Sequence, residues 1–453
     1  MIDEGLEAIA ARAVEAALGA GAGNAEAYVE DSVGREVRVF GGEVESLTEA
    51  GKRGLGVRAW IDGRAGYAYG TELSDQGVTA IAAAAAKSAR VADSDEFAGP
   101  PDVANLAPEI AALFDAGLAN WSTERKVALA KAIEAAARAA DRRIEAVETT
   151  VYADEAARVA LASSTGAGGT YELTESFAYL QAIAAEGGDR QTGLGFGLGR
   201  APDALDAEAI GAEGAQRAAS LLGARKPASR ACPIVLDPTV AASFIGFIGS
   251  TLCADAVQRG RSPFADRLGD SVASAALTLH DDGSDPAGLS TRPFDAEGVP
   301  TGRTALIEQG TLRAYLHDSY TARRAGERTT ANANRSGYRS PPGVGTSNLL
   351  VAPGTRTFEE LLAEAGTGVY VTDVAGLHSG VNPVSGTFSV GATGLEIENG
   401  ALAAPIDEFT IASDLETMLN QIQAAASKPR WVPFGGSVHT PALLIGEMAV
   451  AGS

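Results

Sequence analysis

The fold of the second half of this chain is decided by residues 232–264, which read CPIVLDPTVAASFIGFIGSTLCADAVQRGRSPF. The short apolar run Cys232–Leu236 is expected to form a strand. Asp237-Pro238 follows it, and proline at the first helical position is typical of a helix start. From Thr239 to Val257, apolar residues occupy too much of the helical circumference for a surface helix. We therefore predict a strand that leads into a largely buried helix.

The segment just upstream, residues 223–231, is the preferred domain boundary because it contains Lys226-Pro227 between a helical pattern and the strand. This boundary gives an N-terminal domain of residues 1–225 and a C-terminal domain of residues 226–453. The chain has 453 residues, a length that suits two or three domains.

The N-terminal domain is predicted to combine hairpins with Ala-rich helices. Two hairpins have the two-residue loops Gly41-Gly42 and Asp62-Gly63, which allow the positive φ of primed turns. Ser122 stands where it can cap a helix. The expected helices are residues 5–18, 73–91, 123–140 and 205–222, the expected hairpin strands are 35–40, 43–47, 54–61 and 64–69, and a connector rich in Pro and Asp is expected at 93–108.

The C-terminal domain is expected to be rich in strands. Apart from the helix at 239–257, we predict two shorter helices at 357–365 and 413–425. Hairpin turns are indicated at Gln309-Gly310 and Asn399-Gly400. The predicted fold class is therefore α+β, with an N-terminal α/β domain followed by a mostly antiparallel β domain that holds one buried helix.

Long strands are expected between residues 143 and 200, and one of them has glycine at 193, 195, 197 and 199. A phosphate-binding loop is one interpretation of these glycines, but no helix start follows at once. Close packing of a strand face against another backbone is the preferred interpretation.

Composition limits the classes of function. The net charge of -22 and a pI near 4.6 argue against nucleic-acid binding. No run of about 18 apolar residues suggests a membrane span, and the opening Met1-Ile2-Asp3-Glu4 does not resemble a signal peptide. The two cysteines, Cys232 and Cys253, form no disulfide framework, so a reducing cytoplasm is expected.

Residues that could support catalysis are dispersed. The four histidines, at 280, 317, 378 and 439, are too far apart in sequence for a local zinc motif. Convergence of His317, His378 and His439 in space would make a stand-alone hydrolase, and this alternative stays open. Cys253 lies in an apolar helix, where a buried inert thiol is favoured over a nucleophile.

The segment Thr329–Leu349 is long, polar and rich in Gly, Pro and Asn, as functional loops often are. Arg335, Tyr338 and Arg339 could offer charge-assisted and stacking contacts to a peptide. A plain surface loop is an equally good interpretation of the sequence.

Five segments of the C-terminal domain carry a resemblance to a known family. They are LHDSYTARR (316–324), RTTANANR (328–335), GTSNL (345–349), GVNPVSGTFS (380–389) and GLEIENG (394–400). With them, the chain resembles the TldD/PmbA family of peptidases, and its PmbA (TldE) branch in particular. The GVNPVSGTFS run is the most specific of these segments, and a weaker match extends into the N-terminal hairpins.

The resemblance implies where a metal site is missing. In the metal-binding TldD branch the helix carries His-Glu-x-x-x-His, and alignment on the shared Arg-Gly-x-Ser-x-Phe ending puts these positions at Ile245, Gly246 and Ser250. TldD-type members also have a cysteine near the position of residues 430–434, where this chain has none. The resemblance therefore implies no metal and no catalytic residue in this chain, with zinc held by a TldD-type partner.

The family also implies a cytoplasmic assembly in which a TldD-like subunit and a PmbA-like subunit enclose a chamber that cuts unfolded or modified peptides. We expect a heterodimer with a TldD-like protein, and a homodimer when this chain is alone. A non-enzymatic peptide-binding protein remains the other alternative.

Overall fold

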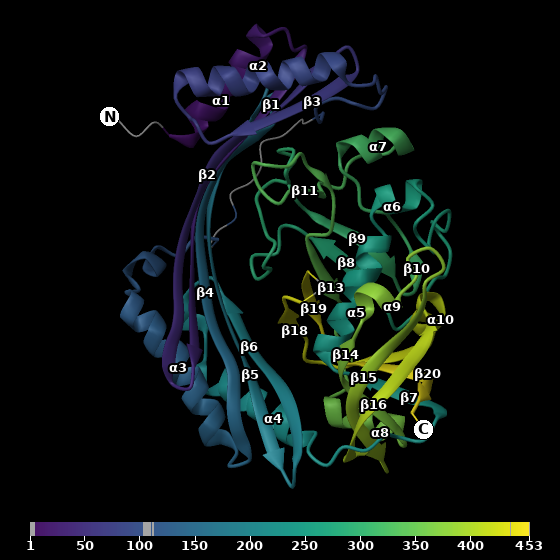
Figure 1. Ribbon diagram of the computed structural model, residues 1–453. Helices are drawn as coiled ribbons and strands as arrows, with labels where there is room; N and C mark the ends of the chain where they lie inside the picture. The colour runs from purple at the N-terminus through teal and green to yellow at the C-terminus, as the bar shows by residue number, and fades with distance from the viewer. Residues whose placement is uncertain (1–4, 103–109, 111–112, 435, 453) are drawn as a thin grey trace.

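A six-stranded antiparallel sheet runs the length of the molecule and curves past one side of the C-terminal half (Figure 1). Its strand order is β3-β2-β1-β4-β5-β6. The strands are β1 (Asn24–Phe40), β2 (Glu43–Ile61), β3 (Arg64–Gly70), β4 (Ile144–Ser163), β5 (Gly168–Glu186) and β6 (Asp189–Gly199). Both predicted two-residue hairpin turns are confirmed, although the strands they join are longer than predicted.

The computed structural model describes residues 5–102, 110, 113–434 and 436–452. The opening Met1-Ile2-Asp3-Glu4 and part of the expected connector, residues 103–108, lie outside these ranges. In the part of the chain that is described, no helix is both long and apolar enough to span a bilayer.

Helices pack on the sheet near its two ends. The helices α1 (Leu6–Gly19) and α2 (Asp75–Val91) lie at one end, and α3 (Thr123–Ala140) and α4 (Ala207–Ser220) lie at the other (Figure 1). Alanine recurs on the buried face of each of these helices, and its small side chain allows close approach to the strands. Ser122 caps α3 as predicted, because its side chain accepts a hydrogen bond from the N–H of Arg125. Two 3-10 turns, η1 (Ala116–Asn120) and η2 (Pro202–Ala204), complete this half.

The glycine-rich strand β6 packs directly against the backbone of α4. A Cβ on Gly193 would lie 2.2 Å from the amide nitrogen of Ala218, and one on Gly195 would lie 2.0 Å from the carbonyl oxygen of Ile210. The packing interpretation of the alternating glycines is thus confirmed.

The C-terminal half contains two six-stranded sheets, and most of their pairings are antiparallel, as predicted. In the first sheet β16 also pairs with β20, so that β16, β15, β14, β7 and β20 close into a barrel. Its strands are β7 (Arg230–Leu236), β14 (Gly368–Ala375), β15 (Thr387–Glu398), β16 (Ala401–Asp414), β17 (Ile422–Ala425) and β20 (Leu443–Ala451). The second sheet comprises β8 (Leu279–Asp282), β9 (Arg303–Glu308), β10 (Thr311–Leu312), β13 (Asn348–Val351), β18 (Arg430–Val432) and β19 (Ser437–Thr440).

The helix α5 (Pro238–Thr251) contacts strands of both C-terminal sheets and is largely buried, as predicted. The predicted helix at 239–257 is nevertheless broken, because the chain resumes only as α6 (Ala254–Gln258). At the break, Cys253 forms an isolated bridge with Leu316. Strand-like hydrogen bonds to Leu316 therefore replace the helical ones at this point.

The remaining elements are short. They are β11 (Ala333–Asn334), β12 (Gly343–Val344), α7 (Ser319–Ala325), α8 (Phe358–Ala365), α9 (Leu377–Gly380) and α10 (Leu415–Asn420). The helix predicted at 413–425 is wrong at both ends. Asp414 is the last residue of β16 and caps α10, and residues 422–425 pair with β20 instead of continuing the helix. The predicted domain boundary falls in the segment between α4 and β7, and the division into two domains stays a prediction.

Candidate functional site between the two halves

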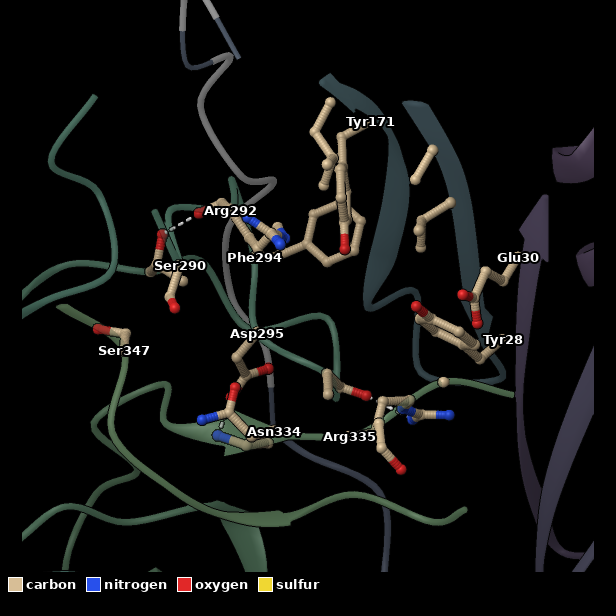
Figure 2. A pocket seen from close by; sticks show the side chains of 18 of the residues that line it. Tyr28, Glu30, Tyr171, Ser290, Arg292, Phe294, Asp295, Asn334, Arg335 and Ser347 are labelled. Carbon is tan, nitrogen blue, oxygen red and sulfur yellow. Dashed lines mark hydrogen bonds between the residues drawn. The ribbon is translucent and has the colours of Figure 1, made fainter. Parts of the chain in front are cut away.

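A polar cavity of about 360 Å³ lies between the N-terminal sheet and the loops of the C-terminal half. Figure 2 shows side chains from both halves facing each other across it. The sheet contributes Tyr28, Glu30 and Tyr171, and the C-terminal half contributes Ser290, Arg292, Asp295, Asn334, Arg335 and Ser347. Such a concave site with convergent polar groups can bind a small polar ligand or one end of a peptide.

Beside this cavity, four buried charges join the two halves. Arg335 Nη2 donates to Glu26 Oε1 at 2.6 Å. Arg58 Nη2 donates to Glu26 Oε2 at 2.6 Å and to Glu297 Oε1 at 3.0 Å. The side chains of Glu26, Glu297 and Arg335 are at most 2% exposed. Glu26 and Arg58 belong to β1 and β2, and the other two belong to the C-terminal half, so this network, which we call the charge clamp, fixes one half against the other.

Two buried aspartates organise the loops around the cavity. Asp295 accepts hydrogen bonds from the N–H groups of Glu297, Val299 and Ala333. Burial together with the nearby charge of Glu297 raises the pKa of Asp295 well above its ordinary value. The second buried aspartate is Asp281, which is 1% exposed and lies on β8.

Asp281 ties the loop 329–349 to β8. Its carboxylate accepts from Asn332 Nδ2 at 2.7 Å and from the N–H of Ser347 at 2.7 Å. Burial raises the pKa of Asp281 to about 6, and these hydrogen bonds oppose part of that increase. The buried side chain of Asp281 therefore holds the loop near both of its ends, at Asn332 and at Ser347.

Two of the three predicted peptide-contact residues are already engaged within the protein. Arg335 belongs to the charge clamp, and its guanidinium lies 4.4 Å from the centre of the Tyr28 ring. Tyr338 is 1% exposed, and its ring packs where a Cβ on Gly54 would otherwise lie. Arg339 is exposed on the same loop. Arg335 lines the cavity while it is held by the charge clamp, Tyr338 is buried, and Arg339 is exposed. Contact of these residues with a peptide stays a prediction.

The three degenerate metal-motif positions do not converge. Ile245 is 1% exposed and lies in the C-terminal core, Gly246 is buried, and Ser250 is exposed. The Ser250 hydroxyl donates to the carbonyl of Phe247 at 2.6 Å. A buried alkyl group, a glycine and a hydroxyl used within the helix do not fit a zinc ion.

A second cavity, of about 460 Å³, lies between β6, α4 and the start of α5. Thr239 and Ser243 line it from α5, and Leu194 lines it from β6. Phe434 also lines this cavity, and its ring centre lies 5.1 Å from that of Phe196. The lining is mixed, because Arg217, Asp373 and Val240 also belong to it.

Two of the three dispersed histidines lie in different settings within the described part of the chain, and the convergence of all three stays a prediction. His439 on β19 stacks on Trp431 at 4.7 Å, and His317 is buried before α7. The side chain of His378 lies outside the described part of the chain. Within the described residues, no three His, Cys, Asp or Glu side chains gather as a metal site would require. Burial raises the pKa of the Cys253 thiol to about 12, which agrees with an inert thiol.

Sequence reasoning missed the charge clamp and the aspartates at the cavity. One weak signal was present, because Glu26 and Glu30 flank Tyr28 on one face of β1 while Ala25, Ala27 and Val29 make the opposite face apolar. A buried carboxylate requires a partner, but nothing in the spacing identifies Arg58 or Arg335 as that partner.

Comparison with known proteins gives concordant results along the chain. Three family profiles match: PmbA/TldA metallopeptidase domain 1 over residues 25–92, the central domain over 117–222, and the C-terminal domain over 229–452. A relative named Metalloprotease PmbA, from Escherichia coli O157:H7, is 31% identical over 99% of this chain and 96% of its own length. A Metalloprotease TldD homolog from Haemophilus influenzae is 26% identical over 88% of this chain and 87% of its own length.

Solved structures agree with the fold. A crystal structure from Thermotoga maritima superposes with a TM-score of 0.90 at 27% identity and covers 99% of this chain and 100% of that one. TldE from Thermococcus kodakarensis superposes with a TM-score of 0.89 at 23% identity, covering 97% and 99% of the two chains. The latter similarity is evidence for the fold alone.

Proposed function

The chain belongs to the PmbA/TldD metallopeptidase family, and from this premise we propose that it is the PmbA/TldE-type subunit of a two-part peptidase. In this proposal the chain supplies walls and substrate contacts. A TldD-type partner supplies the zinc and the catalytic groups. The assembly processes unfolded or modified peptides, and it works in the cytoplasm.

The observation that carries this proposal is the chemistry of α5. At the positions aligned with His-Glu-x-x-x-His, the helix has Ile245, Gly246 and Ser250, and the first of these is buried in the apolar core. At the position aligned with the first histidine of the motif, Ile245 packs in the hydrophobic core and contributes to stability instead of binding a metal. This substitution supports a structural role for α5, with no step of peptide cleavage performed by its side chains.

The surfaces beside α5 support a role in peptide binding. The hydroxyls of Thr239 and Ser243 line the cavity between β6 and α5. They donate to Asp237 and to the carbonyl of Thr239, so their oxygens can still accept from the N–H groups of a peptide backbone. An extended peptide can also add to a strand edge. Arg339 is the exposed member of the predicted contact set. In the assembled peptidase, Arg339→Ala should weaken cleavage without preventing assembly.

Two alternatives predict different activities. A stand-alone hydrolase built from dispersed residues such as His317 and His439 would cut peptides without a partner. A non-enzymatic peptide-binding protein would bind unfolded peptides and would not change the activity of a TldD-type protein.

The experiment that tests the proposal measures hydrolysis of an unstructured peptide by this chain alone, by a TldD-type relative alone, and by the two mixed. We expect efficient cleavage in the mixture and none by this chain alone, after trace proteases have been removed. Cleavage by this chain alone that survives chelation would overturn the proposal. A mixture no more active than the TldD-type protein alone would favour the binding-protein alternative.

A further inference from the structure

Two tyrosine hydroxyls converge on the cavity that lies between the two halves. Tyr28 on β1 and Tyr171 on β5 line this cavity, and Figure 2 shows both side chains extending into it. Tyr28 is 8% exposed, and its hydroxyl makes no hydrogen bond to any residue that the structure describes. Burial raises the pKa of both tyrosines, so both hydroxyls are protonated at neutral pH. A ligand that accepts hydrogen bonds is therefore favoured at this point of the cavity.

The rings that carry these hydroxyls are held in place by packing. The ring centre of Tyr171 lies 5.2 Å from that of Phe294 in an edge-to-face arrangement. The guanidinium of Arg335, which belongs to the charge clamp, lies 4.4 Å from the centre of the Tyr28 ring. Both hydroxyls are therefore oriented before a ligand arrives, and less conformational freedom is lost on binding.

Arg292 adds positive charge beside these hydroxyls. Its guanidinium lies next to the Tyr171 side chain (Figure 2). Nη1 of Arg292 donates to two backbone carbonyls, and Nη2 lies 3.4 Å from Glu175 Oε1. Arg200 Nη1 lies 3.5 Å from the same oxygen. Two guanidiniums therefore share one carboxylate, and within this group one positive charge has no counter-charge.

Two of the acidic side chains at the cavity add little negative charge. Glu30 is paired with Lys52, and the distance between Glu30 Oε1 and Lys52 Nζ is 2.6 Å. Burial and the charge of Glu297 raise the pKa of Asp295, which favours the neutral form of its carboxyl group.

Glu155 is an acidic group at the cavity that would favour a cation instead. Its carboxylate forms no ion pair within the described part of the chain, and it stands opposite Glu175 on the neighbouring strand. It is four residues along β4 from Val159, the residue that pairs with Tyr171. At about 3.4 Å per residue, it lies roughly 13 Å along the sheet from Tyr171. Glu155 is therefore far from the two hydroxyls.

The cavity wall formed by the loop 329–349 is held in a fixed shape. Ala331 lines the cavity and has a φ of 58°, in the left-handed region that alanine rarely adopts. Its N–H donates to Thr329 Oγ1 at 3.1 Å, and Asp281 holds the next residue, Asn332. Strained backbone of this kind persists where surrounding contacts fix it, and it is concentrated at ligand sites.

We propose that Tyr28, Tyr171 and Arg292 form a subsite for the C-terminal carboxylate of a bound peptide. A carboxylate accepts several hydrogen bonds at once, and its bonds to a guanidinium or a hydroxyl are charge-assisted. Every peptide with a free C-terminus offers this group, so the subsite can hold peptides of different sequence. This inference rests on the proposed role of the chain in binding peptides, and it names the part of the peptide that is bound and the residues that bind it.

Binding of short peptides to the purified chain tests this inference without a catalytic partner. The probe is an unstructured peptide without Asp or Glu, labelled at its N-terminus and compared as free acid and as C-terminal amide by fluorescence anisotropy. The amide should bind at least about tenfold more weakly, because it lacks the charge that strengthens these hydrogen bonds. A second amide that contains one internal Glu should bind as weakly as the first, because the subsite is expected to take the end of the chain.

Conservative variants test the residues of the subsite. Tyr28→Phe removes a hydroxyl that no described residue uses, so it should weaken binding of the free acid about tenfold without lowering stability. Tyr69→Phe is the matched control and should leave binding unchanged, because Tyr69 is 54% exposed on β3 and is not among the residues that line the cavity. Glu155→Gln should leave binding of the free acid unchanged or make it tighter, because it removes a negative charge from the cavity.

The outcomes separate this inference from the proposed function. Equal binding of the acid and the amide, or no binding of either, would overturn the carboxylate subsite, whereas cleavage by the mixture with a TldD-type protein would still support the proposed function. Tight binding of the amide with the internal Glu would overturn the choice of the C-terminus in favour of a side-chain carboxylate. Weaker binding by Glu155→Gln, with no effect of Tyr28→Phe, would indicate a cationic ligand and would contradict the inference as well.

Discussion

At the scale of single residues, Asp281 should make the stability of the protein depend on pH. Burial raises its pKa to about 6, above the ordinary value near 3.9. Between about pH 4 and pH 6, the folded protein therefore binds more protons at this site than the unfolded chain does. The free energy of unfolding should fall as pH rises through this window, by about 2–3 kcal/mol from this residue.

The variant Asp281→Asn isolates this effect because it cannot titrate. It loses part of the hydrogen bonding to Asn332 and Ser347 at every pH, which adds a constant offset. Urea unfolding at pH 4 and pH 7 should show wild type losing about 2–3 kcal/mol relative to the variant. Parallel pH profiles for the two proteins would contradict a raised pKa.

At the scale of elements, the buried helix α5 makes a sharp stability prediction. Ile245→Asp places a charge without a partner in the core, where Ile245 is 1% exposed, and should lower the free energy of unfolding by about 3 kcal/mol or more. Ser250→Ala, on the exposed side of the same helix, should change it by less than about 0.5 kcal/mol. Equal effects in urea unfolding would mean that Ile245 faces an open space.

The accuracy of sequence-based prediction varied among elements for identifiable reasons. Hairpin turns and capped helices were predictable, because Gly41-Gly42 and Ser122 act through local backbone chemistry. The break in the helix at Cys253 depends on Leu316, which is distant in sequence. In the same way, α10 ends at Asn420 because residues 422–425 pair with β20. Tertiary pairing overrode the helical pattern in both cases.

The candidate site was predicted less well than the fold. The positions of Ile245, Gly246 and Ser250 on a buried helix followed from the sequence, since apolar periodicity is a local signal. The burial of Arg335 did not, because its partner Glu26 comes from the opposite half of the chain. A solvent-exposed polar loop and a loop that joins two halves of a protein can have the same composition. Composition alone therefore could not show which kind of loop residues 329–349 form.

At the scale of the whole molecule, the charge clamp should couple the stability of the two halves. Arg335→Ala leaves Glu26 buried with only the shared contact from Arg58, and breaking a buried pair in this way costs about 3 kcal/mol or more. Arg339→Ala, four residues further along the same loop and exposed, should cost less than about 0.5 kcal/mol. Urea unfolding that cannot distinguish the two variants would contradict the clamp.

The central claim is that this chain shapes a peptidase without holding its metal. The most direct measurement is the zinc content of the purified chain after dialysis against a weak chelator, with a TldD-type relative treated in parallel. The positions Ile245, Gly246 and Ser250 offer no zinc ligand. We therefore predict far less than one zinc per chain here and about one in the relative. One tightly held zinc per copy of this chain would contradict the account.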